Sequence, residues 1–159
     1  MATVGKETVI VGVDESESSM YALDWTLRHF FSPFASNPPF NLVIVYAKPL
    51  PSATVGLSGP GTAEVLRIIE EDLRRMAERV VETANQICRN KLVTDVVIEV
   101  VQGDARHGLT EAVERHRASL LVVGSHGYGA IKRALLGSVS DYCAHHIGCS
   151  VTIVKKPHA

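Results

Sequence analysis

The sequence predicts one α/β domain in which short buried strands alternate with helices. Three apolar runs, 8–13, 42–47 and 120–123, have the length and β-branched content of strands buried on both faces of a sheet. Segments with the spacing of amphipathic helices separate them. Strands that alternate with helices form a parallel, doubly wound sheet with right-handed crossovers, so we expect helices on both faces.

The composition suits a single domain over residues 1–159. Sixteen basic and seventeen acidic residues nearly balance, and no block of like charge indicates binding to nucleic acid or to a membrane surface. No apolar run approaches the length of a membrane span, and the early acid Glu7 does not fit a signal peptide. Three cysteines are too few for a disulfide framework, which favours the cytoplasm and also allows the nucleus.

The first strand, 8–13, ends at Asp14, and a helix with acids in its first turn follows from Glu15 to about Ser32. The second strand is 42–47. The connection 48–61 is rich in proline and glycine, and we interpret it as an insertion rather than a lid. A long helix over 62–89 carries an apolar stripe that we expect to face the core: Leu66, Ile69, Leu73, Met76, Val80, Ala84 and Ile87.

The second half continues the alternation. A third strand is predicted at 95–101, a helix from Leu109 to about His116, and a fourth strand at 120–123. A last helix opens at Ser138, where the spacing to Asp141 indicates a capping box, and 150–154 is the fifth strand. A zinc site at Cys143, His145, His146 and Cys149 is rejected because adjacent helical histidines point about 100° apart, so we expect no metal ligands.

The residues after the fourth strand have the features of an anion-binding loop. Gly124 and Gly127 allow close backbone approach, Lys132 and Arg133 add positive charge, and the helix at Ser138 offers free amides. The glycines match neither the dinucleotide fingerprint nor the P-loop. The loop therefore predicts a phosphate site of another kind.

The spacing Gly124, two residues, Gly127, nine residues, Gly137-Ser138 resembles the signature of the nucleotide-binding branch of the universal stress protein family. The runs 137–143 and 151–156 resemble plant single-domain members, and the likeness spans 8–156. It implies a five-stranded sheet of order 3-2-1-4-5, which reverses between strands one and four. Ligands of such sheets lie beyond the strand ends at the reversal, here at Asp14 and Gly124.

The charged residues predict where the phosphate half and the adenosine half of the expected ligand lie. Acids at 14, 15 and 17 repel phosphate, so Asp14 suits ribose or base, although a helix-capping role is compatible. The resemblance matches Ala47 with an adenine-contacting position. The predicted nucleotide-binding residues are Gly12, Val13, Asp14, Ala47, Val123, Gly124, Gly127, Gly137, Ser138, Val139 and Ser140, with His126, Lys132 and Arg133 as further phosphate contacts.

The resemblance implies a stress-response or regulatory protein that binds ATP or AMP, with Mg²⁺ as an optional companion. One alternative is a slow ATPase or a phosphoryl or nucleotidyl transferase that uses His126. We predict no catalytic residue, because no nucleophile motif and no second carboxylate accompany that histidine. A second alternative is an interaction or chaperone-like module whose glycine loop is structural.

The fifth strand is expected at an edge of the sheet, where unpaired backbone groups need cover. Family members commonly pair this strand across a two-fold axis, which implies a homodimer through Val151, Thr152, Ile153 and Val154. A monomer whose edge is blunted by Lys155, Lys156 and Pro157 is the alternative.

Overall fold

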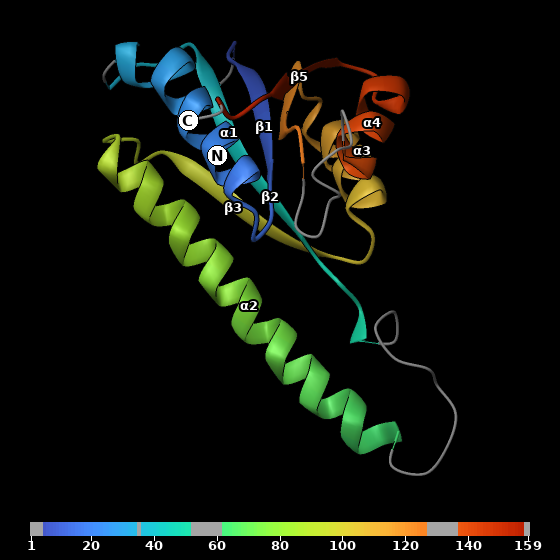
Figure 1. The fold of residues 1–159 in the computed structure, drawn as a ribbon. Coiled ribbons are helices and arrows are strands. Elements are labelled where there is room, and N and C mark those ends of the chain that lie inside the picture. Colours follow the sequence, from blue (N-terminus) through green and yellow to red (C-terminus); the bar gives the residue numbers. More distant parts are fainter. Residues whose placement is uncertain (1–4, 35, 52–61, 127–136, 158–159) are drawn as a thin grey trace.

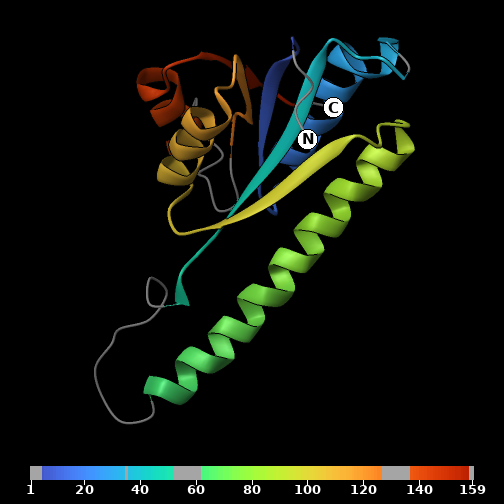
Figure 2. The same cartoon turned by 180° about the vertical axis from the view of Figure 1, so that it is seen from behind.

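The computed structural model describes residues 5–34, 36–51, 62–126 and 137–157. Its five strands form one parallel sheet in the order β3-β2-β1-β4-β5. Helices cover both faces of the sheet (Figure 1; Figure 2). The predicted fold class and strand order are therefore confirmed.

The elements follow the predicted alternation with small changes at their ends. In chain order they are β1 (Glu7–Val13), α1 (Glu17–Phe30), a short 3₁₀ helix (Ser32–Phe34), β2 (Phe40–Lys48), α2 (Thr62–Asn90), β3 (Val96–Gln102), α3 (Ala105–His116), β4 (Leu120–Gly124), α4 (Ser138–His146) and β5 (Ser150–Val154). Among the described residues, no helix combines the length and apolar character needed to cross a bilayer.

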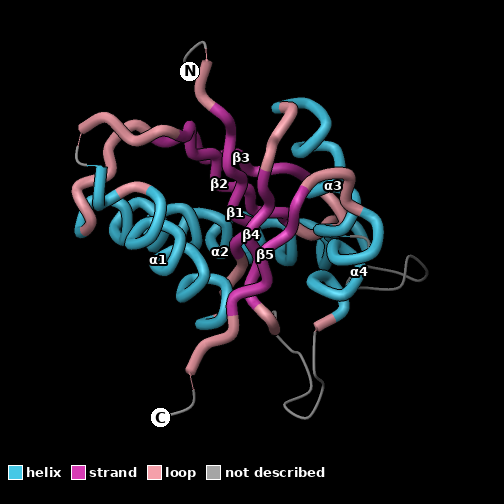
Figure 3. Tube along the Cα trace, turned by 90° about the horizontal axis from the view of Figure 1, so that it is seen from above, coloured by secondary structure: helices cyan, strands magenta, loops and turns pink. Residues whose placement is uncertain are grey.

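The sheet lies between two layers of helices, α1 with α2 on one side and α3 with α4 on the other (Figure 3), and a hydrophobic core fills each side. Val9 and Val11 of β1 pack with residues of α1 and α2, whereas Ile10 between them packs with residues of α3 and α4. Successive side chains of a strand point to opposite faces. Because both faces are covered, the central strands are apolar at nearly every position, which explains the uninterrupted runs in the sequence.

Two predicted helix starts differ from the structure. Helix α3 begins at Ala105, four residues before the predicted Leu109, because the Asp104 side chain accepts a hydrogen bond from the Arg106 amide and caps the helix. Helix α4 has Gly137 at its N-cap, with no side-chain capping bond. The predicted capping box at Ser138 is therefore wrong, since Ser138 is already the first helical residue.

Helix α2 is longer than the sheet face it covers, and its first turns project beyond the sheet (Figure 1). Its buried residues begin only at Leu73. Before that point Val65 is 45% and Ile68 58% exposed. The predicted core stripe is therefore correct for the later turns, whereas Leu66 and Ile69 are only half-buried.

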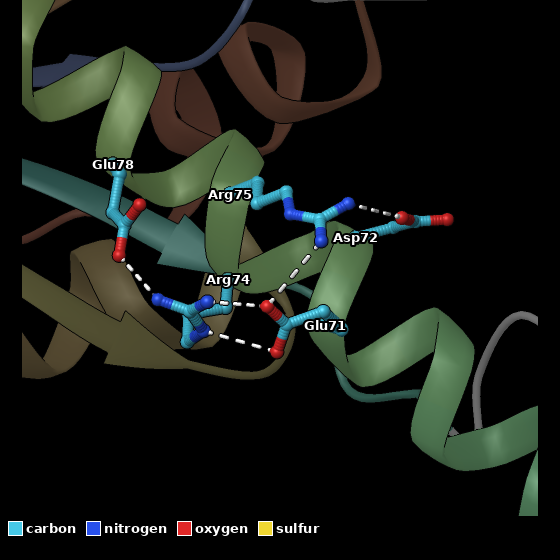
Figure 4. A network of polar contacts seen from close by, with 5 residues as sticks. All are labelled: Glu71, Asp72, Arg74, Arg75 and Glu78. Atoms are coloured by element: carbon cyan, nitrogen blue, oxygen red, sulfur yellow. Dashed lines mark hydrogen bonds and ion pairs between the residues drawn. The ribbon is translucent and has the colours of Figure 1, made fainter.

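The outer face of α2 carries a network of ion pairs (Figure 4). Arg74 pairs with both Glu71 and Glu78, and Arg75 lies 3.7 Å from Glu71 and from Asp72. All five side chains are exposed, so water screens the ion pairs and their contribution to stability is small. These charges keep the outer face of α2 in water.

Candidate functional site

The carboxyl ends of β1 and β4 lie side by side at the centre of the sheet. Val9, Ile10 and Val11 of β1 pair with Leu120, Leu121 and Val122 of β4 in parallel register. On its other side β1 pairs with β2. The chain therefore continues from β1 towards one edge of the sheet, through β2 and β3, and from β4 towards the other edge, to β5. This is the reversal at which doubly wound sheets bind ligands.

A pocket opens at that place, between the strand ends and the first turns of α3 and α4. Its walls are Gly12, Val13, Asp14, Ser19, Val45, Ala47, Ala105, Leu109, Val123, Gly124, His126, Val139 and Ser140. Nine of these positions belong to the set predicted from the sequence. The predicted contacts Gly127, Lys132 and Arg133 lie outside the described residues.

A wider cleft adjoins this inner pocket. It is lined by Asp14, Glu15, Tyr46, Ala47, Pro49, Leu50, Leu73, Met76, Gly103, Asp104, Ala105, Arg106, Ser138 and Val139. Four residues, Asp14, Ala47, Ala105 and Val139, border both cavities. The inner pocket has a volume of about 70 Å³ and the outer cleft of about 790 Å³. The outer cleft lies in the range of roughly 300–1,000 Å³ that is usual for small-molecule sites.

Asp14 holds the start of α1. Its Oδ1 accepts hydrogen bonds from the Ser16 amide at 2.8 Å and from the Ser16 hydroxyl, and its own amide donates to Ser19 Oγ at 2.9 Å. Ser16 is the N-cap, because its hydroxyl accepts from the Ser19 amide. Asp14 therefore braces the start of α1, whereas the helix-capping role expected for it belongs to Ser16, two residues later.

The start of α4 is tied to β4 and β5 by a short chain of hydrogen bonds. The Ser125 amide donates to the Val154 carbonyl at 3.0 Å, and the Gly137 amide donates to the Ser125 carbonyl at 2.7 Å. Ser140 Oγ donates to the carbonyls of Ser125 and Gly137. The Gly137 amide is thus already used and does not point to a ligand.

The backbone amides of Ser138, Val139 and Ser140 form the first turn of α4. Such amides have no acceptor within their own helix, and the helix dipole adds positive potential there. Ser138 and Val139 face the outer cleft, and Val139 and Ser140 face the inner pocket. The described part of the site therefore places a helix N-terminus at the cavity, which is the feature from which the sequence analysis predicts phosphate binding.

His126 lies in the pocket wall. Its amide donates to Ser18 Oγ at 3.3 Å, while its Nδ1 is buried without a hydrogen-bond partner among the described residues. The ring is close enough to the pocket to meet a ligand. No described carboxylate bonds to it, so the structure offers no acid–base pair with Asp14.

Sequence reasoning missed Ser19, Val45, Ala105 and Leu109 in the pocket wall. Ala105 and Leu109 belong to α3, whose start was predicted four residues too late. Val45 follows from strand alternation, because it is two residues before Ala47 and points to the same face. Ser19 has no signal in the sequence, since its place depends on how α1 packs.

Gly124 permits the close contact between β4 and α1. A Cβ atom at this position would lie 2.6 Å from Ser18 Oγ and 2.7 Å from the Ser18 carbonyl carbon and oxygen. Backbone atoms are unable to rotate away as a side chain would. The glycine is therefore required for packing, whatever the ligand.

We expect Gly124→Ala to lower the free energy of unfolding by about 1–3 kcal/mol, because α1 must shift to admit the methyl group. Urea denaturation measures the change. Gly148→Ala is the matched control, since a Cβ there meets nothing within 4 Å; it should change stability by less than about 0.5 kcal/mol. Equal stability of both variants would contradict the packing role.

Asp104 caps α3 at the rim of the outer cleft. Arg106 donates from its side chain and its amide to the Asp104 carboxylate, which lowers the pKa of Asp104 from 3.8 to about 2. A carboxylate whose pKa is lower in the folded state stabilises the fold above its unfolded pKa. This stabilisation is lost as the pH falls from about 4 towards 2.

Asp104→Ala should therefore cost about 1 kcal/mol of stability at neutral pH, through the lost cap. The difference in the free energy of unfolding between Asp104→Ala and the parent should be smaller at about pH 3. Asp104→Asn is the control, because asparagine still caps the helix and lacks the titrating group. Urea unfolding at both pH values tests this, and a loss that does not depend on pH would contradict it.

Comparison with known proteins identifies the family. A model of the universal stress protein family matches residues 6–155. The chain belongs to this family. Universal stress protein PHOS34 of Arabidopsis thaliana is 31% identical over 160 residues, which cover 92% of this chain and 61% of that relative. The chain thus spans about three fifths of this curated relative's length, and the match confirms the resemblance to plant members.

Solved universal stress proteins share the fold. A crystal structure of a universal stress protein in complex with cAMP has a TM-score of 0.65 and 29% identity, covering 94% of this chain and 97% of that one. A family protein from Arabidopsis thaliana with AMP bound has a TM-score of 0.67 and 22% identity, covering 95% and 92%. Both likenesses extend over almost the whole domain.

Proposed function

We propose that this universal stress protein binds an adenine nucleotide, ATP or AMP, at the carboxyl ends of β1 and β4. The observation that carries the proposal is the cavity that joins these strand ends to the first turn of α4. The complex of a family member with cAMP, at 29% identity, supports the ligand class. The output is a stress-response or regulatory signal through the bound state.

The charges of the site orient the nucleotide. Phosphates bind the amides of Ser138, Val139 and Ser140, with Gly124, Gly127, His126, Lys132 and Arg133 as further contacts from the sequence. Asp14 and Glu15 also line the outer cleft, and their carboxylates repel phosphate. The ribose therefore lies towards Asp14, and the base lies against Val13 and Ala47.

The cavity sizes agree with this orientation. The inner pocket of about 70 Å³ is far smaller than a usual small-molecule site. A nucleotide therefore places only part of its volume there and occupies the outer cleft with the rest. Mg²⁺ accompanies the phosphates when the ligand is ATP, at the same end of the site.

Binding is favoured over turnover as the function of this site. An enzyme would use His126, whose described neighbours include no hydrogen-bonded carboxylate. The median enzyme turns over at about 10 per second; release of phosphate from ATP near that rate would establish the enzymatic alternative. A chaperone-like module would bind no nucleotide.

The free thiols of Cys88, Cys143 and Cys149 agree with a reducing compartment. Burial raises the pKa of Cys88 and of Cys143 to about 11, which keeps both thiols protonated at neutral pH. We therefore place the protein in the cytoplasm or the nucleus.

Removal of one amide from α4 tests the phosphate site. Ser138→Pro deletes the N–H at the first helical position, where proline is well tolerated. Gly137 has φ −72° and ψ 165°, which suits a residue before proline. A lost hydrogen bond to a charged group is worth about 1.5–3 kcal/mol, so AMP should bind about ten- to a hundredfold more weakly.

Calorimetric titration with ATP, AMP and GTP measures this effect, and thermal denaturation checks that the fold is intact. Ser138→Ala is the matched control, because it retains the amide and removes only the hydroxyl; it should weaken AMP binding less. If Ser138→Pro bound AMP with unchanged affinity, the proposal that the phosphates bind the α4 amides would be wrong. Absence of binding by the parent would overturn the proposal.

We also propose a homodimer that pairs β5 across a two-fold axis. β5 forms one edge of the sheet, and Val151, Thr152 and Ile153 remain partly exposed. An exposed edge strand is a ready template for pairing. The edge position is shown by the strand order, and the pairing itself is the proposal.

Val151→Asp should shift the protein from dimer to monomer, because a buried carboxylate opposes pairing. Light scattering at micromolar concentration measures the mass. Val97→Asp places the same charge on β3 at the opposite edge of the sheet and should leave the dimer intact. A monomeric parent would contradict the β5 interface. A dimer that persists in Val151→Asp but is lost in Val97→Asp would contradict it as well.

A further inference from the structure

The outer cleft continues past the expected position of the base. The chain that follows β2 leaves the sheet and runs towards the first half of α2 (Figure 2). Pro49 and Leu50 belong to this segment, and Leu73 and Met76 of α2 line the same cleft. We call this part of the cleft, beyond Ala47 along the chain, its far end.

The far end of the cleft is apolar. Leu50, Leu73, Met76 and Tyr46 line it. Leu73 and Tyr46 are already buried, so the apolar surface left to cover belongs to Leu50, which is 42% exposed, and to the half-buried Met76. An apolar surface of this kind gains stability when a ligand removes it from water, at about 25 cal/mol for each Å². Adenine against Ala47 leaves this surface uncovered.

The polar groups around the cleft are already engaged with one another. The Tyr46 hydroxyl donates to Glu15 Oε1 at 3.0 Å, and burial together with Glu15 raises the pKa of Tyr46 well above its ordinary value. Arg106 pairs with Asp104 at 2.7 Å and lies over the Tyr142 ring. The acids at 14 and 15 disfavour a second anionic group here.

Ala47 has a small side chain and borders both the inner pocket and the outer cleft. A nucleotide with its phosphates at α4 and its ribose near Asp14 turns the pyrimidine edge of adenine away from the ribose. Because Ala47 borders both cavities, a group on that edge, at N6 or C2, can extend into the outer cleft, whose lining includes Leu50 and Met76.

We propose that the preferred ligand is an adenine nucleotide that carries an apolar group on this far edge of its base. The proposal rests on the nucleotide-binding function proposed above. The apolar group fills the space between Leu50 and Met76, and Ala47 admits it. Specificity therefore resides in the residue at 47 and in two side chains that do not touch an unmodified nucleotide.

Calorimetric titration of the full chain with AMP and with N6-benzyl-AMP tests the proposal. Burial of a benzyl group should make N6-benzyl-AMP bind at least about tenfold more tightly than AMP. Leu50→Glu and Met76→Glu should each abolish this advantage, because each variant should weaken the binding of N6-benzyl-AMP more than that of AMP. Ala47→Val narrows the space where the inner pocket and the outer cleft meet. It should therefore reduce the preference for N6-benzyl-AMP over AMP.

Ile68→Glu is the matched control, because Ile68 is exposed on the same helix and does not line the cleft. It should leave both affinities unchanged. Tight AMP binding with no preference for N6-benzyl-AMP would overturn this inference and leave nucleotide binding intact. A preference that survives both Glu substitutions would also overturn it, and binding of neither ligand would overturn both proposals.

Discussion

The contact between the first turn of α1 and the end of β4 sets the geometry of the whole site. Gly124 lets the Ser18 backbone approach where any side chain would collide. Ser18 Oγ then accepts a hydrogen bond from the His126 amide, one residue past Ser125. Ser125 in turn bonds to β5 and to the start of α4. One close approach thus fixes α1, β4, β5 and α4 relative to one another, and the pocket is the space that this arrangement leaves.

The pocket is built from backbone more than from side chains. Asp14 is occupied with the start of α1, and Ser140 with the carbonyls that hold α4. The positive end of the site comes from helix amides, which stay in place without any side-chain entropy cost. The positions of these groups therefore depend on the fold of the strands and helices rather than on side-chain rotamers.

Sequence reasoning predicted the sheet because the strands are apolar over their whole length and helices separate them. It also predicted which strand ends meet, through the strand order implied by the family signature. It failed where a local pattern had two interpretations. Ser138 and Asp141 have capping-box spacing, yet Gly137 takes the N-cap because its amide bonds back to Ser125. The predicted start of α3 at Leu109 is four residues late because the sequence pattern alone does not show that Asp104 caps a helix. Ser19 enters the pocket only through packing, which no spacing in the chain records.

The length of α2 has a consequence for how the domain opens. The buried side chains of α2 begin at Leu73, and its members of the hydrophobic core begin at Ala77. Local opening free energies follow such contacts. We therefore expect the turns before Leu73 to open at a lower free energy than the rest of the helix, with Leu73 at the boundary. A molecule that rests against Leu73 and Met76 would lie at that boundary, where ordering one more turn requires little reorganisation of the fold.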